Sequence, residues 1–233
     1  MCTVTFIPVD TGVIITHNRD EKITRLPSDL PKATNHFGKN LWYPKDTEKN
    51  GTWFSADEKG RVACILNGAF KKHTSTPPYR KSRGLVLLDA FNENSFNDWL
   101  DNYNLDNIEP FTLILFENAE TLFELRWDGD EKHIKTLATN IKHIWSSSTL
   151  YSPASKEKRK NWLNTWLEEN PTTAKSLLDF HNYGGDGSSD INLKMEILGS
   201  HKTVSITQFY SNKNERFIDH INFTTDQKLK TNF

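Results

Sequence analysis

Apolar and β-branched residues gather in short runs near the start of the chain, a pattern typical of strands. Residues 3–9 form one such run, and the pattern resumes after a turn tripeptide at residues 10–12 that ends in glycine. Glycine takes positive φ values at little cost, so the tripeptide predicts a tight hairpin turn. Because the turn sets the register of a hairpin, Cys2 is expected opposite Arg19 or Asp20.

The same pattern recurs further along the chain and predicts a second hairpin. Residues 52–56 and 61–67 flank a polar turn at residues 57–60, and the second of these runs contains consecutive apolar residues. A continuous apolar run of this length indicates a strand that is buried on both faces. Residues 26–50, which are polar and interrupted by proline, are expected to form a connection between the two hairpins.

The spacing of apolar residues changes to a helical period at several later points. Residues 153–169 illustrate it, with apolar positions at helical spacing and mixed charges at residues 156–160 that are typical of a solvated helix face. The patterns together predict helices over residues 83–91, 96–103, 153–169 and 172–183, and strands over residues 111–117, 120–127, 132–137, 143–148, 202–210 and 215–223.

The order of these elements decides the fold class. Blocks of hairpins alternate with blocks of helices, whereas a parallel sheet would alternate single strands with single helices. We therefore expect an α+β fold with antiparallel sheets. Neither an internal repeat nor a linker is visible, so one domain over residues 1–233 is predicted.

Composition and charge exclude several classes of protein. The chain has 233 residues with 29 Lys and Arg against 30 Asp and Glu, and its net charge of -1 gives no global attraction to nucleic acid. No apolar stretch reaches the length of about 18 residues that a membrane-spanning helix needs. We also see no secretory signal, and we expect a cytoplasmic protein.

Two cysteines, Cys2 and Cys64, are too few for a disulfide framework, and no Cys/His spacing is typical of a zinc site. No metal and no cofactor is therefore expected. Cys64 falls inside the buried apolar run and is interpreted as packing.

Cys2 is the most suggestive residue because of its position. If Met1 is removed, the thiol belongs to the N-terminal residue and lies beside a free α-amine. An α-amine titrates near pH 8, so it can act as a general base for its own side chain. The alternative is an ordinary strand residue whose thiol takes no part in chemistry.

The first hairpin adds polar groups to this position. Asn18-Arg19-Asp20-Glu21 ends an otherwise apolar strand, opposite Cys2. An arginine near a thiol lowers its pKa, and an aspartate can orient the ammonium or the attacking group. The alternative is a solvated strand end with an ion pair of little energetic value.

These residues resemble the NRDE family, also called the transport and Golgi organisation protein 2 family. The resemblance covers most of the chain and is strongest in Met1-Cys2, Asn18-Arg19-Asp20-Glu21, Gly51-Thr52-Trp53-Phe54, Leu66-Asn67 and Lys81-Ser82-Arg83-Gly84. That family resembles the N-terminal nucleophile hydrolases. The resemblance therefore implies a four-layer αββα sandwich of two antiparallel sheets.

The resemblance also implies roles for single residues. Cys2 would be the nucleophile, with its α-amine as base, and Arg19 and Asp20 would hold the thiol and the substrate carbonyl. Asn67 is similar to the oxyanion-hole asparagine of bile-salt hydrolase-like enzymes. Asn18 is added as a substrate-binding residue, because the arginine and aspartate spacing differs by one residue from that of those enzymes.

Two further positions depart from the family pattern. Ser147 lies in a serine run where relatives carry asparagine, and Lys202 stands where they often carry arginine. A hydroxyl reaches less far than an amide, and lysine lacks the planar fork of arginine. We expect both residues to contact the substrate. The two changes bear on which type of charge that substrate carries.

Two hypotheses follow. The first is an N-terminal cysteine amidohydrolase that acts on a carbon–nitrogen bond other than a peptide bond. The second is a non-catalytic ligand-binding or trafficking protein that keeps the hydrolase fold, in line with the haem or lipid handling and Golgi organisation linked to the family. In both, the expected partner is a small amide-like or hydrophobic molecule, and the sequence does not define an oligomeric state.

Overall fold

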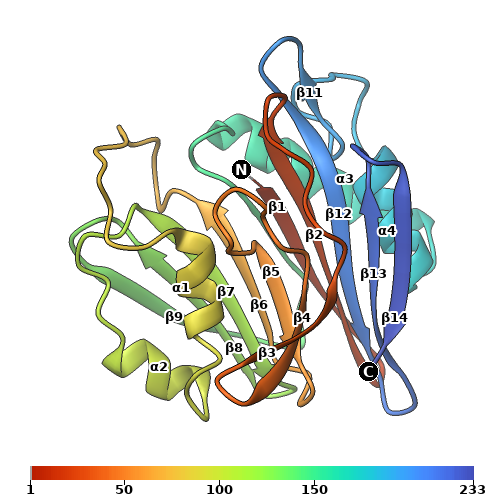
Figure 1. The fold of residues 1–233 in the computed structure, drawn as a ribbon. Helices are drawn as coiled ribbons and strands as arrows, with labels where there is room; N and C mark the ends of the chain where they lie inside the picture. The colour runs from red at the N-terminus through yellow and green to blue at the C-terminus, as the bar shows by residue number, and fades with distance from the viewer. Residues whose placement is uncertain (1) are drawn as a thin grey trace. The chain divides into compact units, whose positions relative to one another are not determined.

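A computed structural model describes residues 2–233, which form two compact units. Unit 1 comprises residues 2–27, 141–146 and 150–233, and unit 2 comprises residues 28–140 and 147–149. Each unit contains one seven-stranded sheet in which every pair of neighbouring strands is antiparallel (Figure 1). The predicted α+β class with two antiparallel sheets is confirmed. The single domain over residues 1–233 stays a prediction.

The sheet of unit 1 has the strand order β10-β1-β2-β12-β13-β14, with β11 paired to β12. Its strands are β1 (Cys2–Val9), β2 (Gly12–Lys22), β10 (His143–Ser146), β11 (Glu196–Ile197), β12 (His201–Ser211), β13 (Arg216–Asn222) and β14 (Gln227–Asn232). The first hairpin therefore lies in the middle of this sheet, with β10 on one side and β12 on the other.

The first hairpin turns at residues 10 and 11, inside the predicted tripeptide, whereas Gly12 begins β2 without the positive φ on which the prediction relied. A side chain at this position would place its Cβ 1.8 Å from the carbonyl oxygen of Ser211, so only glycine fits beside the neighbouring strand. The pairing that follows sets Cys2 opposite Arg19, which is one of the two predicted alternatives.

Two helices of unit 1 pack against this sheet, α3 (Pro153–Glu169) and α4 (Ala174–Tyr183) (Figure 1). The side chains of Ser152 and Thr173 cap them by accepting hydrogen bonds from backbone N–H groups in the first turn. The shared core consists of aliphatic and aromatic side chains that are at most 2% exposed: Ile7, Ile14, Leu163, Leu177, Phe180 and Leu193.

The sheet of unit 2 follows chain order from β3 to β9. Its strands are β3 (Lys32–His36), β4 (Lys39–Tyr43), β5 (Phe54–Asp57), β6 (Val62–Asn67), β7 (Phe111–Asn118), β8 (Thr121–Trp127) and β9 (Lys132–Leu137). The helices of this unit are α1 (Arg83–Asp89) and α2 (Phe96–Asn102). Every residue of β6 before Asn67 is buried, which confirms the predicted two-sided burial and places Cys64 in the core.

The prediction of a plain connection over residues 26–50 is wrong, because this segment contains β3 and β4. The two strands turn at Phe37 and Gly38, whose φ angles are 52° and 75°. Both central residues of such a turn need positive φ, as in the tight turns that suit hairpins. Strands β11 and β14 were also missed. Among residues 2–233, no helix is long and apolar enough to cross a membrane.

Candidate functional site

Cys2 begins β1 and is only 4% exposed. Burial raises the pKa of its thiol above the ordinary value. The thiol is therefore neutral near pH 7 until a base takes its proton. The predicted base requires the removal of Met1, which lies outside the described residues.

Arg19 faces Cys2 across the hairpin and is buried as well. Directly opposed residues of antiparallel strands have Cβ atoms about 4.5–5.5 Å apart, which brings the guanidinium within reach of the thiol. The same guanidinium lies 3.9 Å from the Glu21 carboxylate. A buried cation at this place favours the thiolate over the thiol once a base is present.

Asp20 is fully buried, and both oxygens of its carboxylate accept hydrogen bonds. The Tyr151 hydroxyl donates to one oxygen at 2.6 Å, and the Thr203 hydroxyl donates to the other at 2.7 Å. Burial raises the pKa of Asp20, while the nearby Arg159 guanidinium and the two hydroxyl groups act in the opposite direction. Asp20 is thus held in one orientation by groups that the sequence analysis did not identify.

Arg159 belongs to α3 but is completely buried. Its guanidinium donates to the hydroxyls of Thr3 (2.5 Å) and Ser146 (3.3 Å), and its carbon lies 3.6 Å from the centroid of the Tyr151 ring. The backbone carbonyls of residues 191 and 192 accept from its Nε and Nη2 atoms. The predicted solvated face over residues 156–160 is therefore wrong for Arg159. Its spacing of four residues from buried Leu163 was the available signal.

Asn18 connects the hairpin to α4. Its amide nitrogen donates to the carbonyls of His181 (2.9 Å) and Leu193 (2.7 Å), and its amide oxygen lies 2.6 Å from Nδ1 of His181. Nδ1 must carry the proton of this bond, so Nε2 accepts from the Thr5 hydroxyl at 2.8 Å. Both amide donors of Asn18 are thereby used inside the fold. Contact between Asn18 and substrate stays a prediction.

A β-bulge interrupts β12 beside these residues. Thr203 pairs with Asp20 and Ser205 pairs with Arg19, so Val204 is an extra residue without an opposed partner in β2. Bulges re-aim the side chains next to them. In this sheet the bulge lies at the register position where Thr203 reaches the Asp20 carboxylate.

Lys202 precedes the bulge and pairs with Glu21 of β2. It is partly buried, and unit 1 thus brings five of the predicted site residues onto adjacent positions of three neighbouring strands. These residues are Cys2, Asn18, Arg19, Asp20 and Lys202. Their roles toward a substrate stay predictions.

Asn67 and Ser147 lie together in unit 2. The buried Ser147 hydroxyl donates to the backbone carbonyl of Asn67 at 2.7 Å, and Ser148 donates to the carbonyl of Ala69 at 2.8 Å. Gly68, which lies between Asn67 and Ala69 in the sequence, has a φ of 79°. The side-chain amide of Asn67 makes no hydrogen bond to any residue of the described chain, 2–233. Ser147 therefore supports the loop that carries Asn67.

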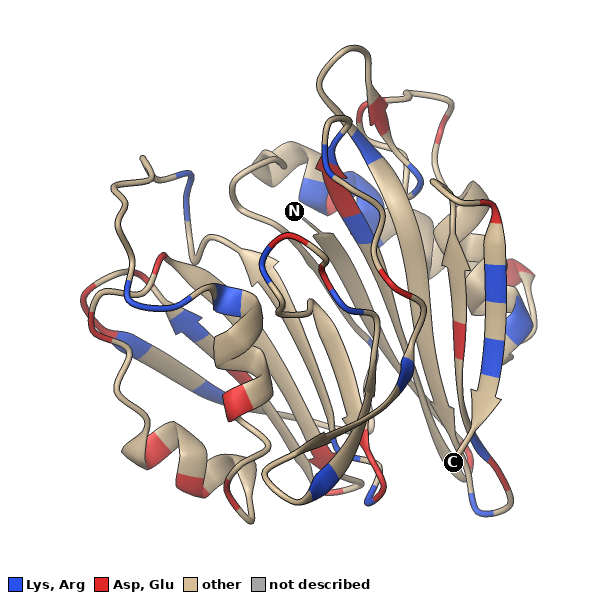
Figure 2. Ribbon diagram, viewed as in Figure 1, with Lys and Arg blue, Asp and Glu red and all other residues tan. Residues whose placement is uncertain are grey.

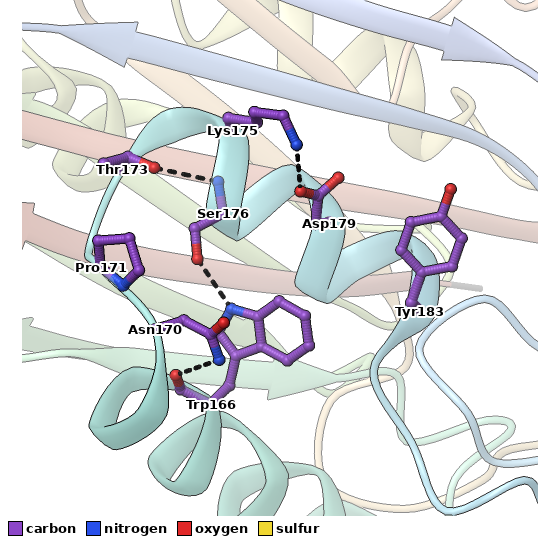
Figure 3. Close-up of a pocket in the computed structure, with 8 residues that line it drawn as sticks. All are labelled: Trp166, Asn170, Pro171, Thr173, Lys175, Ser176, Asp179 and Tyr183. Carbon is purple, nitrogen blue, oxygen red and sulfur yellow. Dashed lines mark hydrogen bonds and ion pairs between the residues drawn. The ribbon is translucent and has the colours of Figure 1, made fainter.

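A cavity of about 570 Å³ opens between α3 and α4, away from the predicted site residues (Figure 3). Its polar groups bond to one another: the Trp166 indole donates to Ser176, and Lys175 pairs with Asp179. No lining residue belongs to the predicted site. Within residues 2–233, no group of three or more His, Cys, Asp or Glu side chains is placed to hold a metal ion.

Solved structures of an acylase, a hydrolase and an acid amidase share this fold. Penicillin V acylase from Agrobacterium tumefaciens aligns with a TM-score of 0.62 and 12% identity, over 100% of this chain and 86% of its own. The C2A mutant of conjugated bile acid hydrolase from Clostridium perfringens aligns with a TM-score of 0.57 and 10% identity, over 100% and 96%. The Caenorhabditis elegans orthologue of N-acylethanolamine-hydrolyzing acid amidase aligns with a TM-score of 0.59 and 10% identity, over 89% and 92%.

Identities this low show the fold alone, and the expected fold of the N-terminal nucleophile hydrolases is confirmed. No curated protein sequence matches the chain. One family model, described as Transport and Golgi organisation 2, matches residues 1–222. The chain therefore belongs to the Transport and Golgi organisation 2 family.

Proposed function

We propose that this protein is an N-terminal cysteine amidohydrolase that cleaves a carbon–nitrogen bond other than a peptide bond. The observation that carries the proposal is the pairing of Cys2 with a buried arginine, Arg19, at the start of the central hairpin. The fold is shared with an acylase and an amide hydrolase. The bile acid hydrolase of the same fold was solved as a mutant in which the residue replaced is also a cysteine at position 2.

The reaction begins after Met1 has been removed. The Cys2 α-amine takes the thiol proton, and the sulfur attacks the amide carbon to form a tetrahedral oxyanion. Collapse breaks the carbon–nitrogen bond, the α-ammonium returns its proton to the leaving nitrogen, and an acyl thioester remains. Water, deprotonated by the same amine, then releases the carboxylic acid and restores the thiol.

The surrounding residues divide the remaining tasks. Arg19 favours the thiolate, and Asp20, held by Tyr151 and Thr203, orients the α-ammonium. Asn67 donates to the oxyanion, and its otherwise unused amide suits that role. One preorganised donor of this kind contributes about 3–4 kcal/mol to the transition state.

Substrate contact forms the final part of the proposal. Lys202 supplies a positive charge at the sheet position opposite Glu21, while Asn18 and Ser147 act mainly by fixing their neighbours. The substrate is a small amide-like or hydrophobic molecule. A cytoplasmic location is part of this proposal because a reducing compartment keeps the Cys2 side chain as a thiol.

Intact mass and thiol labelling test the proposal. We expect a mass that lacks Met1. Both cysteines are buried, but we expect iodoacetamide to label Cys2 rather than Cys64, because only Cys2 has the proposed α-amine base and lies opposite Arg19. The Cys2→Ala variant controls for labelling elsewhere. Retention of Met1 in active protein, or label on Cys64 alone, contradicts the mechanism.

A second candidate is a ligand-binding or trafficking protein without catalysis. The observation that favours it is the burial of Cys2, which raises the pKa of the thiol and opposes thiolate formation. In that case Cys2→Ala retains full ligand binding and cellular function. Acyl transfer that Cys2→Ala abolishes excludes this candidate.

A further inference from the structure

Two turns of unit 1 lie against each other beyond the Cys2 end of the sheet. The first follows β2, and the second joins β11 to β12 (Figure 1). The backbone N–H of Ile23 donates to the carbonyl of Ser200 at 3.1 Å and connects the turns. The second turn closes through Ser200 N–H and the Ile197 carbonyl, with Gly199 at a φ of 71°, which leaves Leu198 at its outermost position.

These turns and the residue that follows the first expose three aliphatic side chains to water. Leu198 is 92% exposed, Leu26 59% and Ile23 46%. Single exposed aliphatic residues are common, but here two lie on the connected turns and a third, Leu26, directly follows the first turn, which closes from Arg25 to Lys22. We call Ile23, Leu26 and Leu198 the apolar tip.

The chain segments that carry the apolar tip contain an excess of basic residues. Segments 21–27 and 194–202 contain four Lys or Arg residues and two Glu residues, an excess of two positive charges, although the whole chain carries -1. Figure 2 shows Lys and Arg at the end of β2 and the start of β12. One of the two acids, Glu21, is already paired with Arg19. Lys22, Lys194 and Lys202 therefore give the tip a local positive field.

The shape and charge of this region favour one kind of partner. A stable protein interface buries about 800 Å² on each side, which requires a broad surface rather than two narrow turns. A bilayer, by contrast, accepts single aliphatic side chains below its headgroups, while flanking lysines contact the phosphates. Each such lysine strengthens binding to anionic lipid, and salt weakens this attraction.

We propose that the apolar tip and its three lysines dock unit 1 onto an anionic lipid surface. Arg19, opposite Cys2, lies three residues before Lys22 on β2, about 10 Å along the strand. Docking thus presents the Cys2 end of the sheet to the lipid. If the proposed amidohydrolase function holds, on which this step rests, the substrate is an amphiphilic amide that resides in the bilayer.

Vesicle sedimentation tests the docking without any substrate. The wild-type chain and Cys2→Ala are each mixed with phosphatidylcholine vesicles, with or without phosphatidylserine. We expect both to bind only when phosphatidylserine is present, and less at high salt. Leu198→Ser should weaken binding by about tenfold or more, and Lys202→Gln by about fivefold.

Ile141→Ser is the matched control, since Ile141 is 53% exposed in the same unit but lies outside the tip. It should bind as the wild type does. Absence of binding to phosphatidylserine vesicles, or equal losses in Leu198→Ser and Ile141→Ser, overturns the proposal. So does a dimer in sedimentation velocity that Leu198→Ser dissociates, because a second copy then covers the tip. Cys2→Ala lacks the nucleophile, so its binding to vesicles does not depend on catalysis. A failure of the docking proposal can therefore be distinguished from a failure of the amidohydrolase proposal.

Discussion

The Tyr151 hydroxyl donates a 2.6 Å hydrogen bond to the carboxylate of Asp20, inside the core of unit 1. Burial and the neighbouring carboxylate both raise the pKa of Tyr151, so the phenol keeps its proton. The opposite side of the interaction is the Arg159 guanidinium, which lies against the face of the same ring. Tyr151 therefore lies between the buried Arg159 guanidinium and the buried Asp20 carboxylate and contacts both.

Tyr151→Phe removes this donor and keeps the ring. We expect the free energy of unfolding to fall by about 2 kcal/mol, because a buried carboxylate loses a hydrogen bond. The folded-state pKa of Asp20 already lies above 3.8, so its ionisation lowers stability as pH rises above that value. The variant should steepen this decline. Urea denaturation at a series of pH values measures both effects.

Tyr183→Phe is the control for this change, since Tyr183 is an exposed tyrosine of the same unit. Its unfolding free energy and pH dependence should match those of the wild type. Equal losses in the two variants would show that the bond between Tyr151 and Asp20 contributes nothing.

Arg159→Met tests the cation behind Tyr151. The substitution keeps much of the side-chain volume but leaves four acceptors, at Thr3, Ser146, Ile191 and Asn192, without their donor, and the Thr3 acceptor is buried. We expect a loss of about 4 kcal/mol in guanidinium denaturation. Arg159→Lys should lower the unfolding free energy less than Arg159→Met does, because lysine keeps the positive charge. It should still be less stable than the wild type, because lysine has only three N–H donors.

Lys158→Met is the neighbouring control on α3. Lys158 pairs with Asp186 on the surface, and exposed pairs contribute little, so the unfolding midpoint should hardly change. An unchanged midpoint in Arg159→Met as well would refute the structural role of Arg159.

The parts of this site that the sequence predicted are local. Gly12 and the apolar runs around it define the hairpin and therefore the opposition of Cys2 and Arg19. The partners of Asp20 are not local: Tyr151 is 131 residues away in sequence, and Thr203 is 183. No periodicity within one element carries that information, because it depends on how β2, β12 and the start of α3 pack.

Missed strands have a related cause. β3 and β4 contain mostly polar residues, and only Leu41 and Tyr43 of the two strands are buried. β3 is the edge strand of this sheet and buries no residue, and β4 beside it buries only two, so neither sequence has the apolar alternation that indicates strands. The sequence feature that indicates the hairpin of β3 and β4 is the dipeptide Phe37-Gly38. It is a weaker predictor of a hairpin turn than Asn-Gly or Asp-Gly.

His181 makes stability depend on pH. Burial lowers its pKa from 6.5 to about 3 in the folded chain, so the unfolded chain binds a proton more readily between these values. The contribution of His181 to stability is therefore fully present above pH 6.5 and is lost as pH falls toward 3, by up to about 1.4 kcal/mol per pH unit. His181→Gln should flatten this slope in urea denaturation.

His220 provides an independent comparison, since burial also lowers its pKa to about 3. His220→Gln should flatten the slope by a similar amount, and the double variant by the sum, because the two side chains have different hydrogen-bond partners. A slope that persists in the double variant would assign the acid sensitivity to other groups.

Substitutions of Asn67 and Ser147 in unit 2 distinguish an effect on turnover from an effect on the free energy of unfolding. Asn67→Ala removes an amide that bonds to nothing else in residues 2–233, so the unfolding free energy should change by less than about 0.5 kcal/mol. If Asn67 holds the oxyanion, turnover of an amide that the wild type cleaves should fall about a hundredfold or more.

Ser147→Ala should show the opposite balance. It removes the 2.7 Å bond to the Asn67 carbonyl, which should lower stability by about 1 kcal/mol and loosen the loop that presents the Asn67 amide. Turnover should then fall less than in Asn67→Ala, and Ser147→Thr, which keeps the hydroxyl, should restore part of it. Measurement of unfolding and turnover on the same three preparations decides the matter. Asn67→Ala with wild-type turnover would remove Asn67 from the mechanism, whereas a large stability loss in that variant would make its role structural.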